Sequence, residues 1–285
     1  MARKRTGFYK TYIYMGRNIM LIKNETLKKI IKKILIKLIN PIATKLGYVR
    51  GNSILREYVD EFNKNSLLSV LFDNLKVIGF KPKHIVDIGA NHGTWTREVL
   101  KHFPDSFYTL LEPQHWLKDS FQDILDTNSK VQFYPVGAGE KEGSFLFTIV
   151  DRDDSCSFRY TEEEAKAAGF DQIEIPVVTL NDLLVENKLP MPDIIKIDAE
   201  GLDIEVLKGA SNFFGKTEIF MVEVGVANKL FDNSFLKMIN FMDENDYRLF
   251  EITDINRPFQ PQVLWLAELV FIKKNGIVDS YQIKF

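Results

Sequence analysis

The stretch 84–93 constrains the fold of this chain more than any other. An apolar, largely β-branched run containing Asp87 is followed by Gly89 and Gly93, and a helical pattern begins at residue 94. This order is typical of a buried parallel strand that turns tightly into a helix. Because open α/β sheets bind nucleotide-like cofactors at such turns, the sequence predicts a cofactor site here.

The acid in this stretch narrows the class of cofactor. A carboxylate at Asp87, expected at the carboxyl end of the strand, repels a pyrophosphate and attracts a ligand that carries an ammonium and a sulfonium. The loop also lacks the middle glycine of a dinucleotide-binding loop, because Ala90 and Asn91 stand between Gly89 and Gly93. S-adenosylmethionine has the required charges and is the expected cofactor, held at its methionine end by these residues.

Two further segments extend the predicted cofactor site. Glu112 ends the apolar run 108–111, about twenty residues after the loop, which is the offset at which a carboxylate holds ribose hydroxyls. Gly137 and Ala138 follow the next predicted strand, and we expect them to line the adenine. The alternative is a turn without a ligand, flanked by two incidental acids.

A second group of acids follows the predicted strand 194–198. Asp198 and Glu200 are expected to face the same crevice as Asp87, because ligands bind outside the carboxyl ends of parallel strands. Methyl transfer to a hydroxyl mainly requires alignment of the partners, and a nearby carboxylate can take the proton of the acceptor. Asp198 is therefore the first candidate base and Glu200 the second. Capping of the next helix is the alternative role of Glu200.

Lys196 and Glu223 complete the charged residues of this region. Lys196 lies on the same face of its strand as Asp198, which predicts a structural ion pair. Glu223 ends the neighbouring strand, and acids at the ends of two strands could hold Mg²⁺. Carboxylates alone leave no diagnostic spacing, so the presence of a metal stays open and Mg²⁺ is the weaker cofactor candidate.

The composition divides the chain into two parts. Residues 1–50 carry 13 Lys and Arg and one acid, whereas the remainder carries 24 basic and 38 acidic residues. The net negative charge of residues 51–285 argues against a nucleic-acid substrate. The single cysteine, Cys156, excludes an internal disulfide and suits a reducing compartment, so we expect a cytoplasmic protein.

The basic leader, residues 1–60, contains an amphipathic segment at 25–40. Its apolar side chains share one helical face and its lysines lie opposite, until Pro41 ends the helix. Such a helix can bind the anionic inner face of a membrane, or it can pack on the protein or on a second subunit. The sequence does not decide between these alternatives, and it leaves the oligomeric state unknown.

Residues 61–285 predict one α/β domain in which strands and helices alternate. We expect seven strands of a mainly parallel sheet at 85–88, 108–112, 131–136, 194–198, 219–224, 247–253 and 263–272, the last two forming an antiparallel edge. The helices are expected near 67–75, 95–103, 117–125, 180–186, 203–213 and 235–245. Between the third strand and the next helix, 144–150 and 173–178 predict an inserted hairpin with a short helix at 161–168.

The chain resembles the FkbM family of S-adenosylmethionine-dependent methyltransferases. The matching segments occur in the family's order over roughly residues 80–274: 86–93, Glu112-Pro113, 177–183, 195–201 with 207–210, and 268–272. The chain departs from the family at Asn181, where Asp is frequent, and in the loop 154–158. The resemblance implies a Rossmann-like methyltransferase fold and O-methylation of sugars, polyketides or other secondary metabolites.

We therefore predict an O-methyltransferase that acts on a hydroxyl of a sugar, a glycolipid or another small molecule. A non-catalytic membrane-surface or scaffold protein with a degenerate cofactor site is the main alternative. A nicotinamide-dependent oxidoreductase is disfavoured, because the chain lacks the middle glycine of the loop and a Tyr-x-x-x-Lys pair.

Overall fold

The computed structural model describes residues 66–229 and 231–282. The basic leader, its amphipathic segment 25–40 and the domain boundary expected near residue 60 lie outside the described residues. Among the described residues, no helix is long and apolar enough to cross a membrane.

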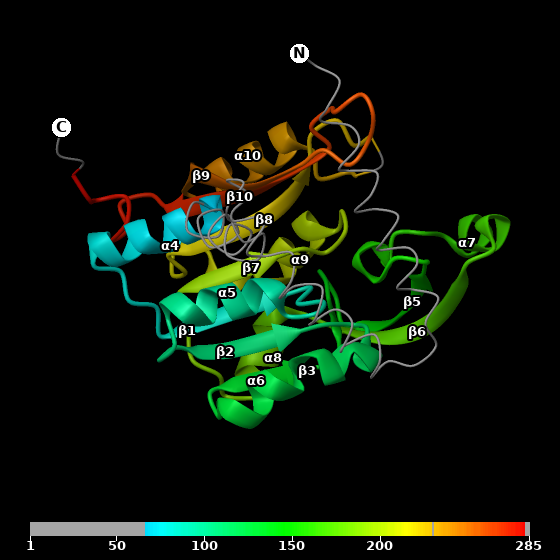
Figure 1. Ribbon diagram of the computed structural model, residues 1–285, viewed down its shortest axis with the longest axis horizontal. Helices are drawn as coiled ribbons and strands as arrows, with labels where there is room; N and C mark the ends of the chain where they lie inside the picture. The colour runs from blue at the N-terminus through cyan, green and yellow to red at the C-terminus, as the bar shows by residue number, and fades with distance from the viewer. Residues whose placement is uncertain (1–65, 230, 283–285) are drawn as a thin grey trace, which may run out of the picture. The chain divides into compact units, whose positions relative to one another are not determined.

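Seven strands form the main sheet, in the order β3-β2-β1-β7-β8-β10-β9 (Figure 1). All neighbours from β3 to β8 pair in parallel, whereas β10 pairs antiparallel with both β8 and β9. The strands are β1 (His84–Ile88), β2 (Phe107–Leu111), β3 (Val131–Tyr134), β7 (Ile194–Ile197), β8 (Ile219–Gly225), β9 (Tyr247–Asn256) and β10 (Leu266–Lys273). This confirms the expected Rossmann-like methyltransferase fold with an antiparallel C-terminal edge.

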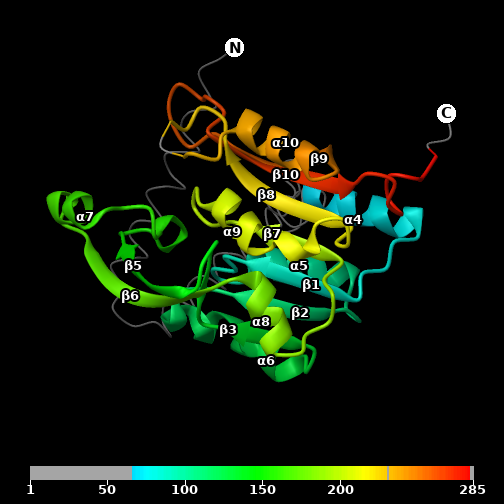
Figure 2. The ribbon, with the colours of Figure 1, turned by 180° about the vertical axis from the view of Figure 1, so that it is seen from behind.

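Helices cover both faces of this sheet, because its central strands are apolar on both sides. Every residue of β1 and β7 is buried, as expected for parallel strands between two helical layers. One layer contains α4 (Leu67–Ile78), α5 (Thr94–His102) and α6 (Gln122–Thr127). The other contains α8 (Leu180–Glu186), α9 (Asp203–Gly209) and α10 (Phe235–Glu244). Figures 1 and 2 show α5 and α8 on opposite sides of the sheet.

The inserted hairpin belongs to a second, three-stranded sheet. β5 (Gly143–Ile149) and β6 (Asp171–Val178) pair antiparallel, which confirms the hairpin, and β4 (Gly137–Ala138) adds to β6 in parallel. The short helices η2 (Asp153–Ser155) and α7 (Glu162–Ala168) connect the arms. The strand expected at 131–136 thus ends earlier, because residues 137–138 leave the main sheet to pair with β6.

Two expected helices also differ in detail. The helix expected near 117–125 is a 3-10 turn, η1 (His115–Phe121), followed by α6. The helix expected at 203–213 ends at Gly209 and continues as the 3-10 turn η3 (Ser211–Phe213). A Cβ at Gly209 would lie 2.0 Å from the carbonyl oxygen of Gly139, so the end of α9 packs directly against the backbone after β4.

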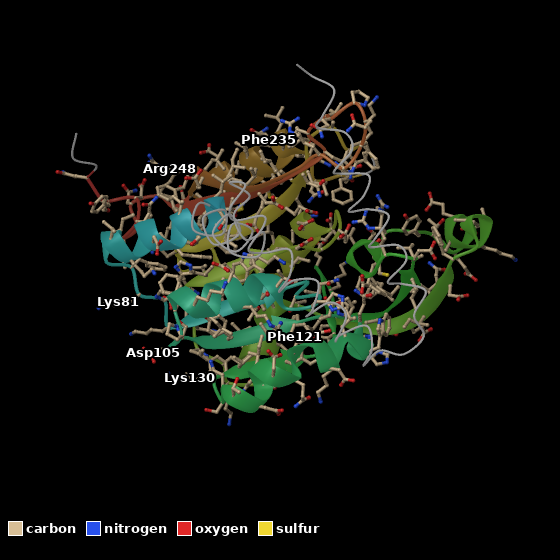
Figure 3. The ribbon with its side chains drawn as sticks, in the orientation of Figure 1. Lys81, Asp105, Phe121, Lys130, Phe235 and Arg248 are labelled. Carbon is tan, nitrogen blue, oxygen red and sulfur yellow. The ribbon has the colours of Figure 1, made fainter. Side chains whose placement is uncertain are left out.

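The two edges of the main sheet differ in what lies beside them. Lys81, Asp105 and Lys130 precede β1, β2 and β3, and they mark the amino-terminal edge in Figure 3. The small sheet lies beyond the opposite, carboxyl-terminal edge (Figures 1 and 2). Ligands bind at that carboxyl edge in open α/β sheets, so the insertion stands next to the expected site.

Candidate active site

A cleft lies at the carboxyl ends of β1, β2 and β7, where the small sheet meets the main one. Its empty volume is about 640 Å³, a figure that includes the open solvent at its mouth. Seven of the predicted site residues line it: Gly89, Asn91, Glu112, Gly137, Ala138, Asp198 and Glu200. The structure therefore brings both predicted acid groups and the adenine segment to one place.

The remaining three predicted residues, Asp87, Ala90 and Gly93, do not line this cleft. Ala90 is 4% exposed and packs in the core below α5, and Gly93 caps the start of that helix. These two residues shape the turn rather than the wall of the cleft. Their contact with a cofactor stays a prediction.

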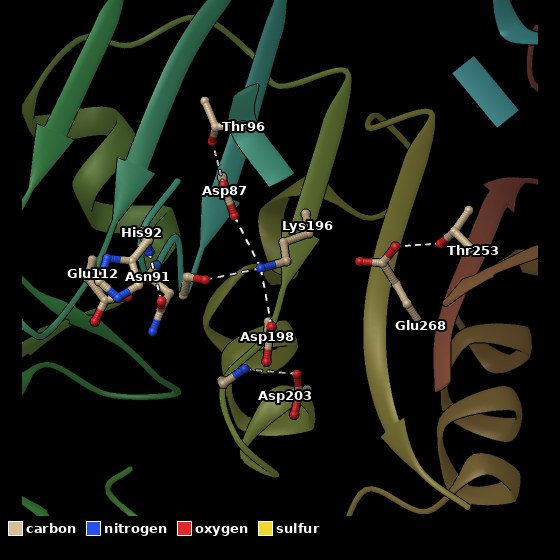
Figure 4. Close-up of polar contacts among 12 residues, drawn as sticks. Asp87, Asn91, His92, Thr96, Glu112, Lys196, Asp198, Asp203, Thr253 and Glu268 are labelled. Carbon is tan, nitrogen blue, oxygen red and sulfur yellow. Dashed lines mark hydrogen bonds and ion pairs between the residues drawn. The ribbon is translucent and has the colours of Figure 1, made fainter. Parts of the chain in front are cut away.

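Asp87 differs most from the expectation. The side chain is fully buried, accepts a hydrogen bond from Thr96 Oγ1 at 2.5 Å and lies 3.3 Å from Lys196 Nζ (Figure 4). The expectation that it faces the crevice is corrected, because Asp87 precedes the last residue of β1 and pairs in register with Lys196 on β7. Asp87 thus fixes the sheet below the cleft, and its role as a cofactor ligand stays a prediction.

Gly89 allows the glycine loop to pass close to β7. Its φ is +72°, and a Cβ there would lie 1.9 Å from the carbonyl oxygen of Asp198. Any other residue therefore both strains the left-handed backbone and collides with the strand end that carries the candidate base. This close approach joins the two sequence motifs into one site.

Glu112 connects the glycine loop to the end of β2. Its Oε2 accepts a hydrogen bond from the backbone N–H of Asn91 at 2.7 Å, and its Oε1 accepts one from Gln114 N–H at 2.9 Å. Burial raises the pKa of Glu112, while these two N–H groups oppose the rise. Each carboxylate oxygen has a second lone pair, so the residue can still receive hydroxyl donors.

Sequence reasoning missed Gln114, which lines the cleft beside Glu112. Its Nε2 donates to the carbonyl oxygen of Asp153 at 2.7 Å, whereas its buried Oε1 has no partner among the described residues. The same carbonyl accepts Asn91 Nδ2 at 3.1 Å. Gln114 lies just after the end of β2, and this position was the one feature of the sequence that could have indicated a site residue.

An aromatic wall closes the side of the cleft where Gly137 and Ala138 are predicted to line the adenine. Phe147 and Phe158 pack with ring centroids 4.8 Å apart, and both line the cleft. A Cβ at Gly137 would lie 2.7 Å from the ring of Phe158. A flat apolar ring against a glycine backbone is a suitable surface for a base, but Phe158 lies in a loop that carries no motif.

Lys196 organises the charges below the cleft. Its Nζ donates to the carbonyl oxygen of Gly89 at 3.1 Å and lies 3.4 Å from Asp198 Oδ2 (Figure 4). Burial by itself lowers the pKa of Lys196, but the charges of Asp87, Asp198 and Glu268 outweigh it and raise the pKa above its ordinary value. The residue stays protonated, which confirms the expected structural ion pair.

Asp203, another residue that sequence reasoning missed, holds the turn that carries Glu200. It is fully buried, and its carboxylate accepts the backbone N–H of Ala199 at 3.1 Å and that of Gly201 at 3.2 Å. Burial, followed by the charge of Asp198, raises the pKa of Asp203 to about 8. The turn is therefore fixed by a buried acid three residues after Glu200.

Glu223 brings a further carboxylate from β8. Oxygen atoms of Asp198, Glu200 and Glu223 all lie within 4.8 Å of one another. Burial, followed by the charges of Asp198 and Glu200, raises the pKa of Glu223 well above its ordinary value. Asp198 and Glu200 thus form an acidic wall of the cleft, with Glu223 beside them but not lining it, and this wall suits a cationic group, a metal ion or an acceptor proton.

Comparison with known proteins agrees with the chemistry of this cleft. The methyltransferase FkbM domain matches residues 87–249, more than half of the chain. The chain belongs to the FkbM methyltransferase family. Every cleft residue named above lies inside the matched range, and the match ends within β9.

The chain is also similar to a curated protein, Methyltransferase 1 of Beauveria bassiana (strain ARSEF 2860). The two are 27% identical over 142 residues, which cover 44% of this chain and 57% of that protein. The chain thus matches little more than half of its relative's length.

Solved structures also resemble the chain. Methyltransferase FkbM from Methylobacillus flagellatus KT is 20% identical, with a TM-score of 0.46, over 66% of this chain and 43% of that one. A precorrin-6y C5,15-methyltransferase from Geobacter metallireducens GS-15 is 12% identical, with a TM-score of 0.42, over 72% of this chain and 86% of that one. The strand order, rather than these likenesses, establishes the fold.

Proposed function

We propose that this protein is an S-adenosylmethionine-dependent O-methyltransferase, acting on a hydroxyl of a sugar, a glycolipid or another secondary metabolite. The observation that carries the proposal is the single cleft in which Gly89, Glu112 and Asp198 meet at the carboxyl edge of the sheet. Membership of the FkbM family supports methyl transfer. The acidic wall supports an acceptor that has a proton to lose.

The residues of the cleft fit the proposed cofactor. Glu112 and the unpartnered Gln114 Oε1 can accept hydrogen bonds from ribose hydroxyls or from the adenine amino group. Gly137, Ala138 and Phe158 form the apolar surface for the adenine, and Gly89 and Asn91, which line the same cleft, would contact the methionine part. When bound, S-adenosylmethionine would supply a methyl group on a positively charged sulfonium sulfur, which is a good leaving group because it becomes a neutral thioether.

The acids then act on the acceptor. Asp198 is partly exposed to the cleft, with 36% of its side chain accessible, and it can take the hydroxyl proton as the ether forms. Lys196 contacts Asp198 Oδ2 and orients the carboxylate, while Asp203 holds the following turn in place. These residues supply alignment and one proton acceptor, which are the main requirements of an in-line displacement.

The test measures transfer of a labelled methyl group from S-adenosylmethionine to a panel of glycosides, lipid-linked sugars and phenols, with RNA as a comparison. We expect a hydroxyl compound to be labelled, and Asp198→Asn to lower turnover at least about 100-fold with little change in S-adenosylhomocysteine affinity. Glu205→Gln, at a partly exposed position of α9, is the matched control. Full turnover by Asp198→Asn contradicts the assigned base, and labelling of RNA alone contradicts the substrate class.

A further inference from the structure

The loop that joins β9 to β10 exposes a group of apolar side chains, which we call the apolar tip: Phe259, Val263 and Trp265. Phe259 is 55% exposed and Val263 48% exposed, and Trp265 is half-buried. No charged residue occurs from Pro258 to Ala267. Single exposed apolar side chains are common on protein surfaces, whereas a group of them in one place marks an interaction site.

Hydrogen bonds on both sides give the apolar tip a defined shape. Arg257 Nη1 donates to the carbonyl oxygen of Gln262 at 3.0 Å, and the N–H of Val226 donates to the carbonyl oxygen of Trp265 at 2.9 Å. The rings of Phe259 and Trp265 pack edge to face, with centroids 5.0 Å apart. Because backbone groups of the loop are already paired, bringing the tip into an apolar environment costs less.

The apolar tip lies at the same edge of the main sheet as the cleft. β10 runs antiparallel to β8, so the loop that precedes β10 meets the carboxyl end of β8. β8 is parallel to β7 and β7 to β1, and the cleft lies at the carboxyl ends of those two strands. Figure 1 shows the loop, in orange, beyond the end of β8.

Basic side chains flank the apolar tip. Arg257 is exposed and immediately precedes it. Lys229 is exposed two residues after Ala227, whose N–H donates to the carbonyl oxygen of Leu264 at 3.1 Å. Cations near a lipid surface are attracted to anionic head groups.

The neighbouring acids do not cancel this positive charge. Asp232 pairs with Lys237, its Oδ1 lying 3.6 Å from Nζ. Asp254 is the remaining acid of the segments 226–234 and 254–267. An uncharged apolar segment between cations is typical of a segment that binds the interface of an anionic membrane. We propose that the apolar tip inserts into the surface of an anionic lipid membrane.

The size of the apolar tip favours a lipid surface over a protein partner. A stable protein interface buries roughly 800 Å² of each partner, which the three side chains of one loop do not provide. Insertion into a membrane interface requires only a few apolar side chains together with electrostatic attraction. Tryptophan also suits that environment, because its ring is apolar and its N–H can bond water or head groups.

The membrane contact indicates an acceptor class, and this step rests on the proposed function. A cleft held at the membrane surface can reach the polar head of a lipid while the apolar chain of that lipid stays in the bilayer. The acceptor is therefore an amphiphile with a hydroxyl-bearing head, such as a glycolipid, rather than a freely soluble sugar.

Quenching of tryptophan fluorescence by bromine-labelled lipids tests the contact in the full-length protein. The vesicles contain equal parts of phosphatidylcholine and phosphatidylglycerol, and neither cofactor nor acceptor is present. The chain has three tryptophans, and we expect the lipid to quench Trp265. Trp265→Phe should therefore remove most of the quenching, whereas Trp116→Phe, at a 40% exposed position after β2, should retain it.

Vesicle sedimentation supplies a second readout. Phe259→Ser combined with Val263→Ser should weaken binding to these vesicles at least about tenfold, because two inserting side chains are lost. The control combines Val185→Ser on α8 with Leu236→Ser on α10, whose side chains are more exposed, at 73% and 67%. We expect the control to bind vesicles like the wild type and both double variants to keep the wild-type Tm.

Three results overturn the inference: no vesicle binding by the full-length protein, quenching that Trp265→Phe does not reduce, or wild-type affinity in the Phe259→Ser and Val263→Ser variant. Loss of a dimer in that variant without lipid would assign the tip to a second copy, and a fall of several degrees in its Tm would show that the protein itself covers the tip. Either outcome also overturns the membrane contact.

Titration with S-adenosylhomocysteine separates this inference from the proposed function. The Phe259→Ser and Val263→Ser variant should bind S-adenosylhomocysteine like the wild type, because neither residue lines the cleft. Quenching of Trp265 without S-adenosylhomocysteine binding overturns the proposed function alone. S-adenosylhomocysteine binding without quenching of Trp265 overturns the membrane contact alone.

Discussion

Single residues of this protein act across elements that are distant in sequence. Lys196 on β7 contacts Asp87 of β1 and the carbonyl oxygen of Gly89 in the following loop. A buried ammonium that touches three acceptors ties the glycine loop to the strand that ends in Asp198. The glycine loop and the end of β7 that carries Asp198 are thus fixed relative to each other by one side chain.

The close approach at Gly89 gives the first prediction. Gly89→Ala adds a methyl group 1.9 Å from the carbonyl oxygen of Asp198 at a φ of +72°. Gly169→Ala is the matched control, because Gly169 has a φ of +75° but nothing within 4 Å of the added Cβ. In urea unfolding, the control should lower the free energy of unfolding by about 1–2 kcal/mol. Gly89→Ala should lower it clearly more. Equal costs would mean that backbone strain alone requires this glycine.

The buried acid Glu268 gives a pH-dependent prediction. Burial raises its pKa to about 7, although the Thr253 hydroxyl hydrogen bond opposes the rise (Figure 4). Because its folded pKa lies above the ordinary value of 4.5, its stabilising contribution is complete below pH 4.5 and is lost as the pH rises through 7. Glu268→Gln should therefore melt like the wild type at pH 5 and a few degrees higher at pH 8.5. A variant that melts lower at pH 8.5 contradicts the assigned shift.

At the scale of elements, the segment around η2 is held against the glycine loop. His92 bonds Asp153 Oδ2 through Nε2 and Ser120 Oγ through Nδ1, both at 2.8 Å. Asn91 and Gln114 bind the carbonyl oxygen of Asp153. The insertion thereby closes one wall of the cleft through contacts with the glycine loop and with Gln114.

This contact predicts a local change in dynamics. The His92–Asp153 pair is about half exposed, so its loss should cost no more than about 1 kcal/mol. His92→Ala should speed hydrogen exchange in residues 151–157 by about three- to fivefold. His115→Ala, at an exposed position, should not change it. If hydrogen exchange in residues 151–157 is unchanged in His92→Ala, the hydrogen bonds of Asn91 and Gln114 are sufficient to hold this segment.

The sequence was sufficient to predict those elements and site residues whose positions a local residue pattern determines. Apolar runs placed the strands of the main sheet, and acids after those runs placed Glu112 and Asp198 at its carboxyl edge. The direction of Asp87 was not predictable, because it depends on the register of β1 against β7, which sets Asp87 opposite Lys196. Phe158 and Gln114 reach the cleft from loops, whose paths depend on the packing of the small sheet rather than on local periodicity.

At the scale of the whole molecule, the basic leader is the part that only the sequence describes. We propose that the helix expected at 25–40 binds an anionic membrane surface, where each lysine contributes about 1 kcal/mol. Such binding would bring the cleft to lipid-linked acceptors at the inner membrane face. Packing on the protein or on a second copy is the competing role.

Vesicle sedimentation distinguishes these roles. Replacing five leader lysines with glutamine should reduce binding to anionic vesicles at least tenfold and leave binding to neutral vesicles unchanged; the positions are Lys28, Lys29, Lys32, Lys33 and Lys37. The control replaces five exposed lysines of the α/β domain with glutamine, namely Lys118, Lys141, Lys166, Lys188 and Lys216. Equal loss in both variants would assign the binding to overall charge, and no loss in either would exclude the leader as a membrane anchor.

S-adenosylmethionine is the ligand that we propose for the cleft at the carboxyl edge of the sheet. Calorimetric titration of the full-length protein with S-adenosylhomocysteine tests it most directly, with NADH as the comparison ligand. We expect one S-adenosylhomocysteine site per chain with a Kd on the order of micromolar, a binding free energy of about −8 kcal/mol, and no heat with NADH. Binding of NADH instead, or of neither ligand, would contradict it.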